Sequence, residues 1–226
     1  MLKYPISTLL YIAKLSIKDK IQDILKLHNN IDIRVEAKVI DKNGKIIKIH
    51  KQRSHSFVAN FLDLLGTQFY NAYGGTNVLY NIISVGNAQD GCVQIMAIND
   101  TNGDSTYGIA IGTGTATPTP TDYRLGNQIN NGTGSGQMVY GAHSFVPSSS
   151  SVNISGGIAS FQVIRTFTNN SGSTITVSEV GIIARIINQA KTLIYSILIV
   201  HDLLSSPISV PNGSTLTVTY TISVTT

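Results

Sequence analysis

The sequence has little charge, a single cysteine and no tryptophan. Only 12% of its 226 residues are Asp, Glu, Lys or Arg, about half the usual share for a soluble domain. Cys92 cannot form a disulfide within the chain, and we expect it to be a small buried hydrophobe. The five histidines lack the spacing of metal ligands. The sequence therefore predicts neither a metal site nor a cofactor.

Membrane-spanning segments are also missing, because no apolar run approaches the roughly eighteen residues that cross a bilayer. Residues 1–16 partly resemble a signal peptide, with Lys3 ahead of an apolar stretch from Pro5 to Ala13. They lack a small-x-small cleavage site, so we expect a retained segment that docks or touches a membrane.

Recognisable catalytic motifs are absent too. GTGTAT at 112–117 is followed by prolines rather than by a helix, which argues against a phosphate loop. No GxSxG elbow occurs. Asp122, Glu179 and Asp202 stand alone, without a partner at a recognisable spacing. Glu179 interrupts an apolar strand, so we expect a buried, structural acid paired with Arg185, Arg165 or Arg124. The sequence predicts a non-enzymatic protein with no catalytic residues.

Hydrophobic residues make up 42% of the chain, enough for a core. Residues 7–28 and 56–73 carry apolar side chains at helical spacing, and Gly74–Gly75 would end the second helix. Between them, residues 31–51 alternate apolar and charged residues around an Asp-Lys-Asn-Gly-Lys turn, which predicts a β-hairpin.

From residue 78 onward the pattern is entirely strands and turns. Pro, Asn and Gly clusters separate eight strand candidates, and the last alternates Leu216, Val218 and Tyr220 with threonines. We predict a mainly β protein: an antiparallel β-sandwich or jelly-roll-like domain at 76–226, preceded by a helix–hairpin–helix segment at 1–75. The strand candidates lie at 77–86, 91–98, 107–114, 136–146, 157–169, 173–187, 191–200 and 214–225.

Basic residues are concentrated at the N-terminus. Residues 1–53 hold 12 Lys/Arg and 5 Asp/Glu, a balance of +7, whereas residues 54–226 hold 4 and 7, a balance of −3. One interpretation is contact with DNA or an anionic membrane. The other is an ordinary solvated surface, since no aromatic residues alternate with the basic ones as base stacking would need.

Asn-x-Ser/Thr acceptor patterns fall in predicted loops, where glycosylation is permitted if the host supports it. They begin at Asn99, Asn131, Asn153, Asn169 and Asn212.

Three stretches, 109–129, 161–184 and 193–224, resemble a recurring pattern of bacteriophage and archaeal-virus structural proteins. In that pattern a GTG-type turn leads to a Thr/Pro loop and an Asp-x-x-Leu segment, here Asp122 to Leu125. A TFTN strand then turns through Asn-Ser-Gly into an SEVG strand, and the chain closes with PI-x-V-x-x-G-x-x-L-x-V-x-Y. Residues 42–65, a hairpin before SFVxNF, look like the N-terminal part of such chains.

The resemblance implies a virion component that forms a ring-like homo-oligomer, as a tail adaptor or nozzle, or a vertex penton or turret protein with a jelly-roll fold. Its partners would be itself and other virion proteins, and the Ile, Tyr and Asn content without Trp fits a thermoacidophilic archaeal host. Three alternatives remain open. A receptor- or glycan-binding sandwich would expose aromatic residues, a cupin-like enzyme would need His-x-His, and a surface-layer or pilus-like protein would carry a cleaved leader.

Overall fold

The computed structural model describes residues 31–54, 57–58, 82–83, 89–90, 96–98, 101–148, 153–187 and 194–225. The predicted helix at 7–28, most of the one at 56–73, and Cys92 lie outside these residues. Phe57 of the second predicted helix is described, and it forms an antiparallel bridge with Val200.

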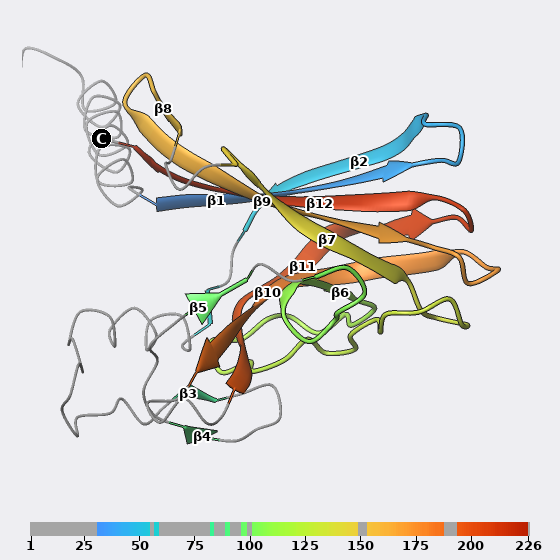
Figure 1. Cartoon of the computed structure of the whole chain (residues 1–226), viewed down its shortest axis with the longest axis horizontal. Helices are drawn as coiled ribbons and strands as arrows, with labels where there is room; N and C mark the ends of the chain where they lie inside the picture. The colour runs from blue at the N-terminus through green and yellow to red at the C-terminus, as the bar shows by residue number, and fades with distance from the viewer. Residues whose placement is uncertain are drawn as a thin grey trace, which may run out of the picture.

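The described chain is mainly β-strand, arranged in antiparallel sheets that face each other like the layers of a sandwich (Figure 1). Each of the eight predicted strand segments contains a strand. The jelly-roll topology stays a prediction. The larger sheet has the order β2 (Ile46–Arg53), β1 (Ile31–Ile40), β12 (Thr215–Thr225), β9 (Ile158–Thr168) and β7 (Val139–Val146), with β8 (Asn153–Ser155) also on β9. In the second sheet, β11 (Ile194–Val210) lies beside β10 (Ile175–Ile187). The other edge of β10 pairs with two short strands, β6 (Gly108–Gly112) and β5 (Met96–Ala97). A separate two-stranded sheet consists of β3 (Ile82–Ile83) and β4 (Gln89–Asp90).

The predicted hairpin is confirmed as β1 and β2. Asp41 closes its turn by accepting hydrogen bonds from the backbone amides of Asn43 and Lys45, each at 2.9 Å. Along its whole length β1 also pairs with β12 near the C-terminus. The hairpin therefore shares a sheet with the C-terminal strands, and the division of the chain at residue 75 stays a prediction.

Four consecutive strands form one long hairpin folded in two. β9 pairs with β12 in the larger sheet, while β10 pairs with β11 in the other. The chain passes between the two sheets twice, from β9 to β10 and from β11 to β12. The fully buried Asn169 ties these two connections together, because its Nδ2 donates to the carbonyls of Val210 at 2.7 Å and Ser173 at 2.8 Å. A glycan on Nδ2 would break both bonds, so the prediction that Asn169 is an available acceptor is wrong.

Apolar residues from both sheets form the core. Leu216, Val218 and Tyr220 of β12 point inward as predicted and are fully buried. The Ile197–Val200 stretch of β11 is buried on both faces. Leu198 belongs to a separate cluster with Leu125 and Ile183, which packs beneath the segment between β6 and β7. That segment must therefore be held against the outer side of the β10–β11 layer.

A register shift bends β11 between its pairings with Val177 and Glu179. Side chains from β2 bind backbone groups at this bend. Gln52 donates to the carbonyl of Leu203 at 2.9 Å and accepts from the amide of Ser205 at 2.9 Å, and Lys48 donates to the carbonyl of Pro207 at 2.7 Å. Polar residues on the inner side of β2 thus connect the two sheets.

We predict that Asn169→Ala lowers the free energy of unfolding by about 3 kcal/mol, because it leaves buried carbonyls without donors. Asn170→Ala, at the exposed neighbouring position, should change it by less than about 0.5 kcal/mol. Urea titration of both variants makes the comparison. Equal, small effects would show that the side chain of Asn169 does not tie the two connections.

Candidate functional site

The segment between β6 and β7 is anchored on the carboxylate of Glu179. This residue lies in β10, opposite Gly112 of β6, and its side chain is 2% exposed. Its oxygens accept hydrogen bonds from the backbone amides of Gly114 at 2.9 Å, Gly126 at 2.9 Å and Asn127 at 2.7 Å. Three amides from two stretches of loop therefore converge on one anion.

The glycines of the GTG turn allow this close approach. A Cβ atom on Gly112 would lie 2.3 Å from Oε1 of Glu179, and one on Gly114 would lie 2.4 Å from it. Any side chain would push the carboxylate out of its cradle. The motif thus resembles a phosphate loop in one respect, since backbone N–H groups gather around an anion. Here the anion belongs to the chain itself.

His201 of β11 joins Glu179 to a second carboxylate. Its Nε2 lies 2.9 Å from Oε2 of Glu179, and its Nδ1 lies 2.7 Å from Oδ2 of Asp122. Ionised carboxylates only accept hydrogen bonds, so both ring nitrogens must carry a proton. Burial by itself lowers the pKa of His201, but the hydrogen bonds to Glu179 and Asp122 outweigh it and raise that pKa above its usual value. The geometry and the raised pKa both favour the doubly protonated, charged form of this buried ring.

Both acids are held in their charged form. Burial acts to raise the pKa of Glu179, yet the hydrogen bonds from His201 and from the amides of Asn127, Gly126 and Gly114 bring it down to about 2. The pKa of Asp122 is also lowered: burial opposes the shift, while Thr119 and His201 outweigh it by hydrogen bonding. Thr119 binds Asp122 through its backbone amide at 2.9 Å and its hydroxyl at 2.6 Å. We call Glu179, His201 and Asp122 the loop clamp.

A buried cation complements this clamp on the inner side of the fold. Arg165 of β9 is 0% exposed and donates to backbone carbonyls, including those of Gly141 at 2.8 Å and Ile109 at 3.0 Å. Its guanidinium also lies over the ring of Tyr140, 4.7 Å from the centroid. It donates further to the carbonyls of Thr101, Asp104 and Tyr107.

Asp202 follows His201 in β11 and points to the opposite face of the strand. Its Oδ2 accepts from the hydroxyls of Ser54 at 2.7 Å and Tyr220 at 3.0 Å. Burial, followed by the charge of Asp202, raises the pKa of Tyr220 well above its usual value. Adjacent residues of one strand thus anchor a loop on one side and the core of the larger sheet on the other.

Several sequence predictions about these acids need correction. Glu179 is a buried, paired acid, but its partners are His201 and backbone amides rather than an arginine. Arg165 binds carbonyls, while Arg185 and Arg124 lie over tyrosine rings, each 5.4 Å from the centroid. Asp122, Glu179 and Asp202 do not stand alone. The sequence did contain one signal for these contacts: the polar pair His201–Asp202 interrupts an apolar strand, which indicates two buried polar side chains that need partners.

The clamp is suited to holding structure. Both nitrogens of His201 are bonded to carboxylates, and Glu179 receives three further donors.

In the described part of the chain, no group of three or more His, Cys, Asp or Glu side chains is arranged to hold a metal ion. The same part contains no helix long and apolar enough to cross a membrane. Comparisons with protein-family models, curated proteins and solved structures find no match to this chain.

We predict that the free energy of unfolding is greatest between about pH 4.5 and 6.5, the ordinary pKa values of Glu179 and His201. Because folding raises the pKa of His201, its contribution is complete below pH 6.5 and is lost as the pH rises through the folded value. Because folding lowers the pKa of Glu179, its contribution is complete above pH 4.5 and is lost as the pH falls towards 2. Urea titrations from acidic to alkaline pH measure both losses of stability, the acid limb below pH 4.5 and the alkaline limb above pH 6.5.

His201→Gln separates the clamp from other titrating groups. It should lower the free energy of unfolding at pH 6 by about 3 kcal/mol, since it leaves the buried carboxylate of Glu179 without its cation. It should also flatten the alkaline limb. His50→Gln, at a half-buried histidine on β2, is the matched control and should keep that limb. A wild-type profile that is flat from pH 6 to alkaline pH would contradict a charged His201.

Proposed function

We propose that this chain is a non-enzymatic structural protein of a virus particle, a subunit of a ring-like homo-oligomer. Its place would be the tail, as an adaptor or nozzle, with a capsid vertex as the alternative position. The observation that carries the proposal is the described surface of the sandwich, which is poor in charge and exposes mainly hydroxyl and aliphatic groups, while buried charged residues bind within the fold.

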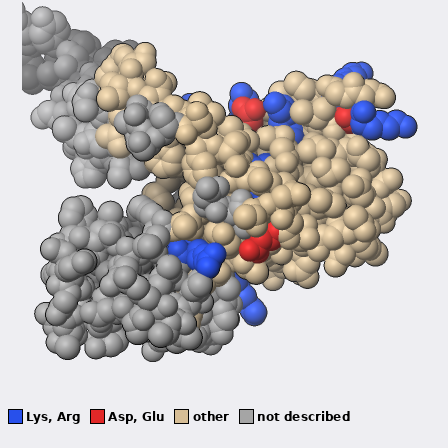
Figure 2. Space-filling view, viewed as in Figure 1, with Lys and Arg blue, Asp and Glu red and all other residues tan. Residues whose placement is uncertain are grey.

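Charge is scarce on the described surface outside the β1–β2 hairpin. Figure 2 shows Lys, Arg, Asp and Glu along that hairpin and in a second, smaller group lower on the described face, while the tan surface between the two groups carries few of them. Arg165, Glu179 and Asp202 lie buried in the fold. Threonine and serine cover much of the rest, as along β12. Such a surface can be buried against neighbours without stripping water from many charges.

Exposed aliphatic side chains gather at one end of the larger sheet. Val224, Ala159 and Ile154 lie in one row across β12, β9 and β8. Ile154 is 74% exposed and Val224 40% exposed, although both continue the inward-facing positions of their strands. Ile158, the first residue of β9, is 43% exposed. An apolar sheet end of this kind favours contact with another subunit.

The virion setting rests on the resemblance of residues 109–129, 161–184 and 193–224 to phage and archaeal-virus structural proteins. Those stretches contain the three members of the loop clamp, so the shared pattern describes packing and implies no active site. Other virion proteins are the proposed partners besides the chain itself. An archaeal host is proposed from composition alone.

The rival glycan- or receptor-binding function has less support. It would use exposed aromatic residues in loops, yet Tyr107, Tyr140 and Tyr220 are buried in the sandwich. Tyr73 and Tyr80 lie outside the described residues. Binding of the whole chain to a glycan array would favour this rival.

Negative-stain electron microscopy and light scattering of the full chain test the proposal. Closed rings are expected, with sixfold or twelvefold symmetry for a tail position and fivefold symmetry for a vertex. Ile154→Asp with Val224→Asp should shift the population to monomers with an unchanged circular dichroism spectrum. Thr117→Asp, in an exposed loop, should leave the rings intact. A stable wild-type monomer at high concentration would overturn the proposal.

A further inference from the structure

The outer face of the β1–β2 hairpin combines exposed isoleucines with an excess of positive charge. We propose that this face binds the surface of an anionic lipid bilayer. The inference goes beyond the assembly proposed above and does not depend on it, because it concerns the opposite, charged part of the larger sheet.

Pairing between the two strands places the relevant side chains in order along one face. Val35, Ala37 and Val39 of β1 are buried, so the alternate residues of β1 lie on the outer face. Across the hairpin, four outer rows follow one another towards the turn. They pair Arg34 with Arg53, Glu36 with Lys51, Lys38 with Ile49, and Ile40 with Ile46.

A bulge creates the apolar end of this series. The register shifts between Val39 and Ile40, so Ile46 rather than Ile47 lies opposite Ile40. Ile46 is 50% exposed, Ile47 44% and Ile49 49%. Half-exposed isoleucines clustered beside a turn leave an aliphatic patch in water, which favours contact with an apolar medium.

Positive charge surrounds the patch. Residues 31–53 hold seven Lys/Arg and three Asp/Glu, a balance of +4. Lys42 and Lys45 flank the isoleucines at the exposed turn. Asp41 is bonded to the backbone of that turn, and Glu36 forms an ion pair with Lys51 at 2.7 Å. The lysines at the turn therefore remain available to an anionic surface.

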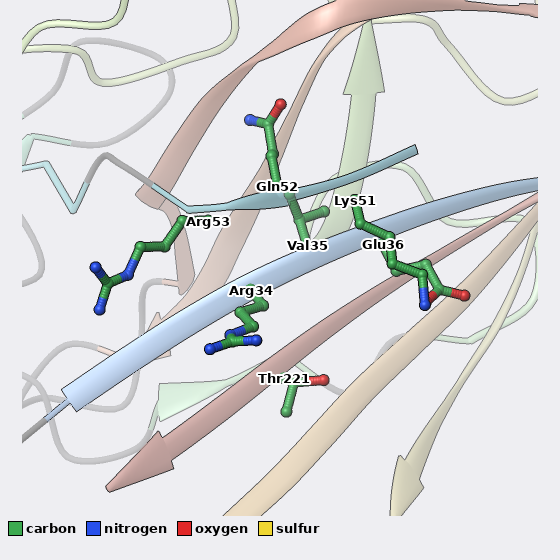
Figure 3. A pocket seen from close by; sticks show the side chains of 7 residues that line it. All are labelled: Arg34, Val35, Glu36, Lys51, Gln52, Arg53 and Thr221. Carbon is green, nitrogen blue, oxygen red and sulfur yellow. The ribbon is translucent and has the colours of Figure 1, made fainter. Parts of the chain in front are cut away.

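A depression of about 590 Å³ lies on the same hairpin, on the side of the patch away from the turn, and is lined by Arg34, Lys51 and Arg53 together with Glu36. Figure 3 shows Arg34 and Thr221 on one side of the strands and Gln52 pointing to the other. Asp32 binds only the Nε atoms of Arg34, at 2.7 Å, and Arg53, at 2.6 Å. Their terminal nitrogens remain able to bind a phosphate-bearing headgroup.

A bilayer fits this combination better than the other anionic partners. Aliphatic side chains enter the boundary between headgroups and acyl chains, while lysines contact the headgroups. A DNA backbone would use the charges but not the isoleucines. Among the described residues outside the hairpin, a second copy of the chain offers little acid in return, because Glu179 and Asp202 are buried and Asp122 is bonded to His201.

Flotation of the full chain with vesicles tests the inference. Binding is expected to phosphatidylcholine vesicles that contain phosphatidylglycerol, with little binding to phosphatidylcholine alone and a loss at high salt. Lys42→Ala with Lys45→Ala should weaken binding roughly thirty-fold, at about 1 kcal/mol for each lysine. Ile47→Ser with Ile49→Ser should weaken it about tenfold or more.

Val146→Ser is the matched control, since it removes a half-exposed aliphatic side chain from β7, at the opposite edge of the larger sheet from β2, and it should bind as wild type. Circular dichroism and light scattering of each variant exclude unfolding or altered assembly as the cause. Absence of binding to the anionic vesicles would overturn the proposal. So would unchanged binding by the isoleucine variant: if the lysine variant alone were weakened, the face would be a site for a polyanion such as duplex DNA.

Discussion

The Glu179 carboxylate is the anchor on which much of the described fold depends. The chain from residue 101 to 138 contains little regular structure apart from β6, so its backbone polar groups need partners outside a sheet ladder. Glu179 accepts hydrogen bonds from three of its amides. His201 balances the charge of the Glu179 carboxylate and also binds Asp122, which belongs to the same segment. Arg165 does the complementary task for carbonyls of the same segment. Glu179 and Arg165, buried charges of opposite sign, thus hold one irregular stretch of the chain.

This internal use of charge explains why the surface divides into two regions. The sandwich uses Glu179, Asp202 and Arg165 inside and exposes mainly hydroxyl and aliphatic groups. Within the part of the chain that the structure describes, the hairpin carries most of the exposed charge, beside its isoleucines (Figure 2). Both regions belong to the same six-stranded sheet, because β1 pairs with β12. In our account, one end of that sheet meets other subunits and the outer face of its hairpin meets a lipid surface.

Local patterns predicted the strands, while the clamp required long-range knowledge. The alternation of apolar and polar residues in 31–51 and 214–225 predicted β1, β2 and β12, because this pattern depends only on the residues of each strand itself. Burial of Glu179 was also predictable from its apolar neighbours. Its partners were not, because amides from loops 52 to 65 residues away carry no charge in a sequence. Nor did alternation reveal the bulge that brings Ile46 to the outer face, since one extra residue reverses the pattern.

The protonation state of His201 tests the central claim most directly. Nitrogen chemical shifts of its imidazole ring, measured by NMR at pH 6 and above, report whether each ring nitrogen carries a proton. A ring held between two carboxylates should show both nitrogens protonated at pH 6 and remain so above its ordinary pKa of 6.5. A neutral ring with one unprotonated nitrogen at pH 6 would contradict the clamp.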